Sequence, residues 1–549
     1  MSVVKGFLNA LQKDVKLGIR VLIFALSGIL TGLTVAFPQI GFLSWLTIVP
    51  AGIILIKRAS SRETKLRSAY FDGLVFFYFY YLVCYHFFLS MYPLDFIDGV
   101  NNATAAAVVV IAWFGLSLLQ AFFGGFVFLL CALLFRGRIC QRVLLLKPVA
   151  IAAIWAIFEW SQNFGWWGVP WGRLPLSQTH YIVGIQNASW LGSYFLTFVI
   201  VLVNLCIALL LLEANKERIV KATAILAVSV ITFQYASGAL IWFTTDNKEG
   251  DTTRIACIQG NISASNKWTV DTFDQIQTVY WNETRKAAKE GAEIVVWPET
   301  AIPFNITRMI YSGYDDMCKE LAKETGVYIL VGAYSTEGEN NYNSLICYTP
   351  EGERLGTAYH KRRLVPFGEF VPMRSVFETV IPPLTEILIT IDDCSQGEDA
   401  NIMNIGGNEV GGLICFDSIY DGLTRETVRE GADFICLSTN DSWFSGSAAL
   451  RMHNSHAQIR AIESGRYITR SASTGVSTVI SPRGEVLKEL EADTEGYIIY
   501  DVHKRENKTV WSVVGNVFVY LCIGFCVALL VEKILPKKQK NVSEISQNT

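Results

Sequence analysis

The chain has 549 residues, of which 51% are hydrophobic and 17% are charged, with a mean hydropathy of +0.34 and a net charge of -3. A soluble protein carries about a quarter charged residues, so this composition indicates a membrane protein. The near-neutral balance, without a basic patch interleaved with aromatic residues, predicts no nucleic-acid partner. These averages hide a division, because residues 1–250 and 508–535 are mostly apolar, whereas 251–507 has the composition of a globular domain with a sizeable core.

Eight apolar segments are long enough, or nearly so, to cross about 30 Å of hydrocarbon. They cover residues 19–37, 40–56, 69–91, 104–135, 148–163, 191–212, 222–243 and 510–532. The fifth is the weakest candidate, because it is short and contains Glu159. The first follows several basic residues but lacks a small-residue cleavage site, so we expect it to be retained as a span.

Basic residues alternate between the loops that join these segments. Lys and Arg gather at the N-terminus, in 57–67, 136–147 and 216–221, and in the tail after 532, whereas 38–39 and 92–103 have none and 164–190 has only Arg173. By the positive-inside rule, this alternation predicts eight spans with both termini in the cytoplasm. The 251–507 domain is then expected on the outer face, which is the periplasm in a bacterium with two membranes.

The loop 164–190 has an unusual composition for a connection between two spans. It contains Trp166, Trp167, Pro170, Trp171, Arg173, Pro175, Gln178 and Gln186. Two interpretations stay open for it. The loop is either an interfacial aromatic belt or a re-entrant wall of a cavity that faces the soluble domain.

The soluble part alternates strands and helices along the chain. Strands are expected at 254–259, 293–297, 327–333, 343–348, 355–359, 410–414 and 434–438, helices at 271–290, 312–325, 418–430 and 450–465, and several strands within 467–502. The turn Pro350–Glu353 favours a hairpin between its two flanking strands. Such alternation predicts an α/β layered sandwich. We therefore expect seven transmembrane helices in 1–250, a catalytic domain in 251–507, and an eighth helix with a basic cytoplasmic tail in 508–549.

Three ionisable residues of different types each follow an expected strand: Glu299, Lys361 and Cys415. Strand ends converge at one rim of such a sheet, so residues far apart in sequence can meet there. A carboxylate, an ammonium group and a thiol together supply a base, an oxyanion clamp and a nucleophile. Cys415 also lies where a strand ends and a helix begins, and a helix N-terminus stabilises a thiolate.

Two of these assignments compete with simpler interpretations. Lys361 is followed by Arg362 and Arg363, so a solvated basic patch is the alternative for it. Cys415 alone could be a core residue, and Cys436, which ends a similar strand without the surrounding motif, is expected in the core.

Other residues with catalytic potential are expected to be structural. His453 and His456 lie three apart on an expected helix, so we predict that they pack or cap it rather than act on a cysteine. Arg460 and Glu463 have the same spacing and are expected to pair. Although twelve cysteines are present, no CxxC pair or Cys/His cluster with zinc spacing occurs, which predicts no metal site.

Longer strings surround these candidates. They are Gln259 to Asn261, Trp297 to Thr300, Lys361 to Pro372, Asn440 to Phe444 and His456 to Arg466, together with Phe42 to Leu46, Phe158 to Trp160 and Pro170-Trp171 in the membrane half. Nearly the whole chain thus resembles the apolipoprotein N-acyltransferase family of the nitrilase superfamily. The resemblance implies a bundle of eight transmembrane helices and a periplasmic nitrilase-like αββα sandwich, with Glu299, Lys361 and Cys415 as the catalytic triad.

The resemblance also implies an activity. Such an enzyme transfers an acyl chain from a phospholipid to the N-terminal α-amino group of the diacylglyceryl-cysteine of apolipoproteins, through a thioester on Cys415. The implied setting is the bacterial inner membrane, with a phospholipid donor, a diacylated apolipoprotein acceptor, the bilayer as partner, a monomeric state and no cofactor. Two other functions stay open, a membrane-anchored nitrilase-type amidase and a transporter or receptor whose outer domain only binds a ligand.

Supporting residues follow from the same resemblance. Glu369 corresponds to a second glutamate that supports the triad and positions substrate, and Trp268 to a functional tryptophan on a mobile loop, with a simple interfacial anchor as its alternative. The family usually has an aromatic residue and then Glu after the cysteine; here Phe416 and Asp417 stand there, and Asp417 is one methylene shorter. The apolar stretch 376–391 is too short to span, and we favour an arm resting on the bilayer near the thiol over a core segment.

One further residue departs from the family's pattern. Arg173 stands in the Trp-rich loop, where smaller or apolar residues are expected.

Overall fold

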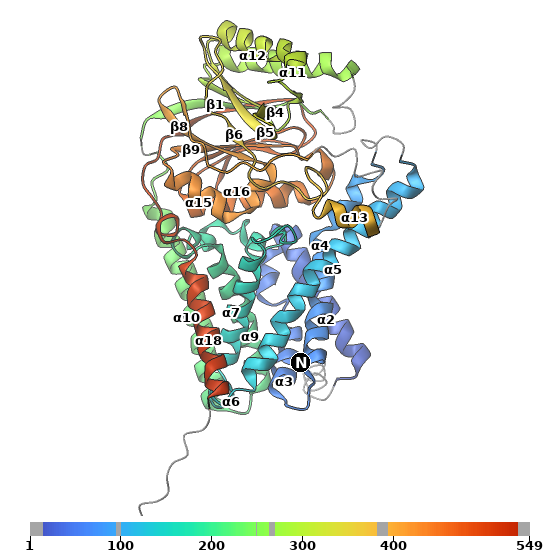
Figure 1. Cartoon of the computed structure of the whole chain (residues 1–549). Helices are drawn as coiled ribbons and strands as arrows, with labels where there is room; N and C mark the ends of the chain where they lie inside the picture. The colour runs from blue at the N-terminus through green and yellow to red at the C-terminus, as the bar shows by residue number, and fades with distance from the viewer. Residues whose placement is uncertain (1–14, 95–99, 249, 263–269, 381–392, 536–549) are drawn as a thin grey trace, which may run out of the picture.

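A computed structural model describes residues 15–94, 100–248, 250–262, 270–380 and 393–535. A long helical bundle lies beneath a domain built on two β-sheets (Figure 1). The bundle contains α2 (Leu17–Ala36), η1 (Pro38–Trp45), α3 (Val49–Ser60), α4 (Leu66–Cys84), α5 (Asn102–Phe135), α7 (Leu146–Ser161), α9 (Ser193–Leu212), α10 (Glu217–Thr244) and α18 (Val517–Ile534). These helices coincide closely with the apolar segments of the sequence.

Within the described ranges, six helical stretches are long and apolar enough to cross a membrane. They are Leu17–Ala36, Pro38–Ser60, Asn102–Phe135, Ser193–Leu212, Glu217–Thr244 and Val517–Ile534. The bundle helices α4 and α7 are not among them, and α7 has only 16 residues.

The last candidate span, Val517–Ile534, begins later than the predicted segment 510–532. The chain forms α17 (Val510–Val514), breaks at Gly515 with a φ of +70°, and only then enters α18. Arg425 of the outer domain holds this break, because its guanidinium donates to the carbonyls of Ser512 (3.1 Å) and Val513 (2.8 Å). The end of α17 is thus satisfied by a side chain rather than by a further helical turn.

The outer domain is an αββα sandwich (Figure 1). One sheet has the order β13-β1-β2-β4-β5-β6, with β3 beside β4, and the other has the order β12-β11-β10-β9-β8-β7. The strands of the first sheet are β1 (Thr252–Gln259), β2 (Ile294–Val296), β3 (Ile302–Asn305), β4 (Tyr328–Glu337), β5 (Asn340–Tyr348), β6 (Tyr359–His360) and β13 (Gly496–His503). Those of the second are β7 (Met403–Ile405), β8 (Asn408–Ile414), β9 (Phe434–Thr439), β10 (Ile468–Ala472), β11 (Ser477–Ile480) and β12 (Val486–Leu490).

Alternating side chains place the two sheets and their helices. Ile255 and Cys257 of β1 belong to the apolar cluster between the sheets, whereas Ala256 and Ile258 belong to the cluster beneath α11 (Val270–Lys289) and α12 (Ser312–Thr325). The second sheet is covered by α15 (Asp421–Arg429) and α16 (Ala449–Ser464), and this helical layer rests on the bundle (Figure 1).

The expected hairpin forms, with Tyr348 opposite Arg354 across its turn, but its second strand is shorter than predicted. β5 pairs mainly with β4, from Ile329 opposite Tyr348 to Glu337 opposite Asn340, and only its residues Ser344 and Leu345 pair with β6. Of the strand expected at 355–359, only Tyr359 lies in β6, which pairs with the edge of β5 that faces away from β4. β3 and β7 were not predicted.

The loop 164–190 contacts the outer domain, which is the side that its second interpretation expected it to face; the cavity wall of that interpretation stays a prediction. The Tyr420 hydroxyl donates to the carbonyl of Gly168 (3.0 Å), and the Gln186 amide donates to the carbonyl of Arg483 (2.9 Å). The ring of Trp171 is buried and packs against His453 and His456 of α16. The loop is thus an interface rather than a belt facing only lipid.

Arg173, the residue that departs from the expected pattern of this loop, is fully buried at that interface. Its Nη2 atom lies 3.3 Å from Oδ1 of Asp421 and donates to Asn163 (2.7 Å). Burial alone would raise the pKa of Asp421, but Arg173 and Arg460 outweigh it and lower this pKa to about 2. The expected pair of Arg460 and Glu463 forms nearby, with a separation of 3.0 Å.

Arg173→Met is expected to destabilise the full chain by about 3–5 kcal/mol, because it removes the nearer of the two cations that face the buried carboxylate of Asp421. The double variant Arg173→Met/Asp421→Asn should recover at least half of that loss in thermal unfolding in detergent. The pKa of Asp421 is lower in the folded state than in the unfolded state. The stabilisation that its charge gives to the folded state is therefore complete above about pH 4 and is lost as the pH falls toward about 2. Additive losses in the double variant would show that the two residues are not coupled.

Candidate active site

Glu299, Lys361 and Cys415 meet where the two sheets face each other. Glu299 follows β2 and Lys361 follows β6, both in the first sheet, whereas Cys415 follows β8 of the second. The expectation that all three residues follow strands of one sheet is therefore wrong, since the strand ends that carry them belong to two sheets that face each other. The three side chains nonetheless lie close enough for the charges of Glu299 and Lys361 to act on the thiol.

Lys361 is the centre of this cluster. Its Nζ atom lies 2.7 Å from Oε1 of Glu299 and 2.9 Å from Oε2 of Glu369, and the residue is 1% exposed. Burial alone would lower the pKa of Lys361, but the two carboxylates outweigh it and raise this pKa well above its ordinary value. Lys361 is therefore a buried cation at neutral pH, and the alternative of a solvated basic patch is wrong.

Asn343, on β5, was missed by sequence reasoning. Its amide donates to Oε1 of Glu299 and to Oε1 of Glu369, both at 2.8 Å, so it holds the two carboxylates in place around Lys361. The backbone N–H of Asn440 adds a bond to Oε2 of Glu299 (2.9 Å). An asparagine on a strand carries no spacing signal, so only the three-dimensional arrangement identifies it.

Asp417 supports the turn that carries Cys415. Its Oδ2 atom accepts from the N–H of Ile414 (3.1 Å) and from the hydroxyl of Tyr359 (2.8 Å), while Oδ1 accepts from the N–H of Arg363 (2.7 Å). The residue is fully buried, and burial raises its pKa to about 6. Asp417 thus joins the thiol's turn to the segment that follows Lys361, which places it in a positioning role rather than in contact with substrate.

The thiol itself is in a strained and desolvated position. Cys415 has a φ of +46°, in the left-handed region that residues with a side chain seldom adopt. It begins η6 (Cys415–Ile419), a five-residue 3₁₀ helix, instead of the α-helix that was expected to stabilise a thiolate. Burial and the carboxylate of Glu299 raise the pKa of Cys415 well above its ordinary value. The resting group is therefore a thiol that needs a base.

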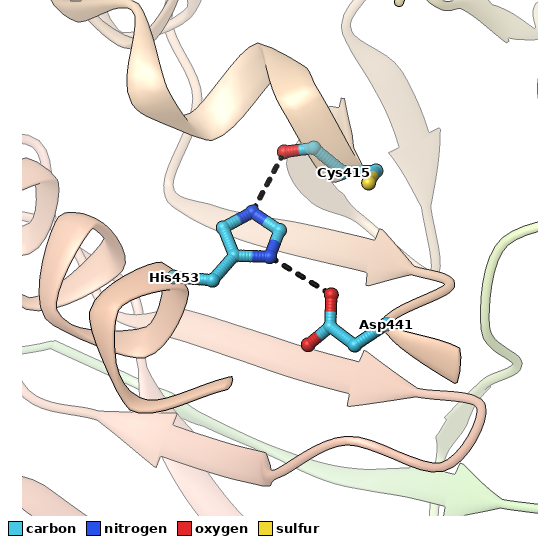
Figure 2. Close-up of side chains that lie close together, drawn as sticks. All are labelled: Cys415, Asp441 and His453. Carbon is cyan, nitrogen blue, oxygen red and sulfur yellow. Dashed lines mark hydrogen bonds and ion pairs between the residues drawn. The ribbon is translucent and has the colours of Figure 1, made fainter. Parts of the chain in front are cut away.

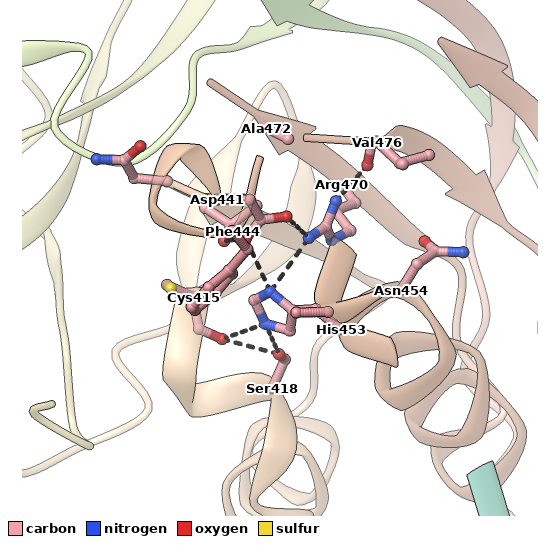
Figure 3. A network of polar contacts seen from close by, with 12 residues as sticks. Cys415, Ser418, Asp441, Phe444, His453, Asn454, Arg470, Ala472 and Val476 are labelled. Carbon is pink, nitrogen blue, oxygen red and sulfur yellow. Dashed lines mark hydrogen bonds and ion pairs between the residues drawn. The ribbon is translucent and has the colours of Figure 1, made fainter. Parts of the chain in front are cut away.

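His453 binds the backbone of Cys415 rather than its sulfur. Its Nε2 atom lies 3.1 Å from the carbonyl oxygen of Cys415, and its Nδ1 atom lies 2.8 Å from Oδ1 of Asp441 (Figure 2). Arg470 pairs with the other oxygen of Asp441, and Ser418 also bonds both His453 and the Cys415 carbonyl (Figure 3). This network fixes the turn, as a packed histidine would, and leaves the role of base to Glu299.

Cys415, Asp441 and His453 are also the residues that could hold a metal ion, since one ligand atom from each lies within 4.8 Å of the others. Both ring nitrogens of His453 are already hydrogen-bonded. Asp441 is neutralised by Arg470, which lowers its pKa together with His453 against the effect of burial. The donor set is thus satisfied by protein groups, and we assign it no ion.

The residue after the thiol contacts the side of the domain that meets the bundle. Phe416, the next residue, packs against the apolar cluster that forms the core of the bundle. Phe87 and Trp171 of the bundle contact the ring of Phe444 at 4.8 and 5.4 Å between centroids, and Phe444 is drawn in the same network as Cys415 (Figure 3). Phe416, next to the nucleophile, and Phe444 thus pack against one apolar cluster to which both parts of the chain contribute, here called the apolar wall.

Two predicted features fall partly or wholly outside the described residues. Trp268 lies outside them, as do residues 381–391 of the expected arm 376–391. Immediately before that stretch comes α13 (Arg374–Val380), and Met373 and Val376 are exposed.

Two family models match the chain. The model of the apolipoprotein N-acyltransferase N-terminal domain covers residues 27–206, and that of carbon-nitrogen hydrolase covers 254–508. The chain belongs to the apolipoprotein N-acyltransferase family. This family lies within the nitrilase superfamily, so the two-sheet domain is nitrilase-like and the chain is an enzyme.

Relatives agree along most of the chain. The apolipoprotein N-acyltransferase of Gloeobacter violaceus is 27% identical over 91% of this chain and 92% of its own length, and that of Geobacter metallireducens is 29% identical over 68% and 72%. An amidase from Nesterenkonia sp. with a known crystal structure is 17% identical, with a TM-score of 0.36, and covers 50% of this chain and 97% of the amidase. The match to the first relative includes both the bundle and the outer domain.

Proposed function

We propose that this enzyme transfers an acyl chain from a phospholipid to the N-terminal α-amino group of the diacylglyceryl-cysteine of an apolipoprotein. Lipoprotein N-acylation is the activity named for its relatives. The observation that carries the proposal is that the charged cluster of Glu299, Lys361 and Glu369 acts on the thiol of Cys415, while the next residue, Phe416, packs against the apolar wall. Such a thiol can reach an acyl chain that enters from lipid.

In the first step, Glu299 takes the proton of the Cys415 thiol, and the sulfur attacks an ester carbonyl of the phospholipid. Two of the three N–H groups of Lys361 face carboxylates of the described residues, and the third stabilises the oxyanion with a backbone N–H near Cys415. The carbon–oxygen ester bond breaks, Glu299 returns the proton to the leaving alkoxide, and a lysophospholipid departs. A thioester remains on Cys415.

In the second step, the α-amino group of the lipidated cysteine attacks the thioester. Glu299 accepts a proton from the attacking amine and returns one to the departing sulfur, so an amide forms and the free thiol is restored. The apolar wall against which Phe416 packs keeps water from competing with the amine.

The charge alternation of the loops supports the orientation of this enzyme. We assign eight spans, including α4 and α7, with the catalytic domain of 251–507 in the periplasm, and the flanking segments 1–250 and 508–549 in and below the inner membrane. The partners are the bilayer, the phospholipid donor and the diacylated apolipoprotein, and we assign a monomer that uses no cofactor.

The test is to incubate the purified full chain with a phospholipid that carries a fluorescent acyl chain. A labelled protein band that hydroxylamine removes is the expected result, because hydroxylamine cleaves thioesters. Release of free fluorescent acid without a labelled band would instead indicate a hydrolase. Retention of intact phospholipid without any turnover would indicate a domain that only binds ligand.

A further inference from the structure

Arg363 is attached to the active site through its backbone. It follows Lys361 by two residues, and its N–H donates to Oδ1 of Asp417 at 2.7 Å. Asp417 in turn holds the turn that carries Cys415, through the N–H of Ile414. The position of Arg363 is therefore fixed relative to both the oxyanion clamp and the nucleophile.

The guanidinium of Arg363 lies at the interface between the outer domain and the bundle. It is 4.9 Å from the centre of the Tyr420 ring, whose hydroxyl donates to the carbonyl of Gly168 in the bundle loop. The ring of Phe416, next to the thiol, meets the same Tyr420 edge-on at 5.3 Å. A cation thus stands on the membrane side of the outer domain, next to the turn of Cys415.

Its neighbouring cations all have carboxylate partners. Lys361 faces Glu299 and Glu369, and Arg362 lies 2.8 Å from Glu426. Arg363 differs, because no carboxylate oxygen of the described residues lies within 4.0 Å of its guanidinium, and its buried Nε atom has no hydrogen-bond partner there. A half-buried cation without a counter-ion is unfavourable unless a ligand supplies the negative charge.

We propose that Arg363 binds the phosphodiester group of the donor phospholipid. The proposal rests on the proposed function and identifies the phosphodiester as the part of the donor that this residue binds. The ester carbonyl and the phosphate of such a lipid are joined by a single glycerol unit, so a residue fixed to the thiol's turn can engage the phosphate while the sulfur attacks the ester. The planar guanidinium matches two phosphate oxygens at once, and the ligand's charge compensates the cation.

The consequence is a preference for glycerophospholipids over neutral acylglycerols. A guanidinium that binds only the oxygens of the phosphodiester does not distinguish the group beyond it, so the proposal assigns the same contribution to donors with different head groups.

Arg363→Gln in the full chain is expected to raise the apparent KM for a fluorescent-chain phospholipid about tenfold or more, with little change in kcat. Acylation by a 4-nitrophenyl ester, which has no phosphate, should proceed at the wild-type rate. Arg363→Lys should recover part of the affinity for the phospholipid, since it keeps the charge. Arg451→Gln is the matched control, because Arg451 is an exposed arginine of the same domain that pairs with Glu489.

A measurement on the wild type tests the same proposal without any variant. A dialkyl ether phospholipid, which cannot donate an acyl chain, should inhibit acylation by the nitrophenyl ester at least about tenfold more strongly than the corresponding dialkylglycerol. Equal inhibition by the two ethers, an unchanged KM in Arg363→Gln, or an equal loss with both donors would overturn the proposal. Those results, obtained alongside normal hydroxylamine-sensitive labelling of the wild type, would leave the proposed function standing, whereas absent labelling of the wild type would remove that function itself.

Discussion

Replacing Cys415 with alanine is expected to lower formation of the acyl-enzyme from a labelled phospholipid by about 10³-fold or more, because the nucleophile is gone. Cys415→Ser should also fail, since a hydroxyl is harder for Glu299 to deprotonate than the thiol and forms an ester instead of a reactive thioester. The measurement is the intensity of the hydroxylamine-sensitive band after incubation with a fluorescent-chain phospholipid.

The loss in Cys415→Ala can be separated from unfolding. The bonds that hold its turn run to main-chain atoms, from Ser418 and His453 to the carbonyl of Cys415 and from Asp417 to the N–H of Ile414. They persist when the sulfur is removed, so the thermal midpoint should stay close to that of the wild type. Cys436→Ala, which alters a buried thiol on the neighbouring strand β9, is the control that should keep its label. A labelled chain still attached to Cys415→Ala would contradict the assignment of the nucleophile.

The elements of the outer domain could be predicted wherever a strong periodic pattern coincided with a clear end. The helix over 312–325 matches α12 at both ends, because its amphipathic pattern stops at Gly326, which adopts the left-handed conformation after the last turn. The strand ending before Cys415 was also predicted, since β8 is a continuous buried run. The length of β6 was overestimated. It has only two residues, because the extent of a strand depends on its pairing with a neighbour, here β5, and not on its own sequence alone.

The last span shows that an apolar pattern does not predict a break in the helix. Residues on both sides of Gly515 are apolar whether they form one helix or two, so hydropathy alone reads them as continuous. The break depends on Arg425, which lies far away in the sequence.

The candidate site was predictable only in part for a similar reason. Glu299, Lys361 and Cys415 each stand at a strand end, so the sequence marks them locally. The sequence gives no local signal for Asn343 or for the pairing of Arg173 with Asp421. Their roles depend on contacts with residues that are distant in the sequence and that the fold brings together. The role of a helix end at Cys415 was predicted wrongly, since local sequence does not distinguish a short 3₁₀ turn from the start of an α-helix.

Lys361→Met is expected to have the second largest effect, because this side chain serves both chemistry and folding. Losing an oxyanion donor slows acylation by about 10²–10³-fold, equivalent to roughly 3–4 kcal/mol of barrier. The same change leaves Glu299 and Glu369 without their common cation in a buried site, which is expected to lower the stability of the outer domain by about 3–5 kcal/mol. Acylation rates and thermal unfolding of the full chain measure the two effects.

The double variant Lys361→Met/Glu369→Gln separates chemistry from folding. The net charge of the three side chains Glu299, Lys361 and Glu369 is -1 in the wild type. It becomes -2 in Lys361→Met and returns to -1 when Glu369→Gln is added. Stability should therefore recover substantially in the double variant, while acylation stays at the low level of Lys361→Met because no cation faces the oxyanion. Recovery of acylation together with stability would mean that Lys361 only neutralises its neighbours, and the oxyanion would then need another donor close to Cys415.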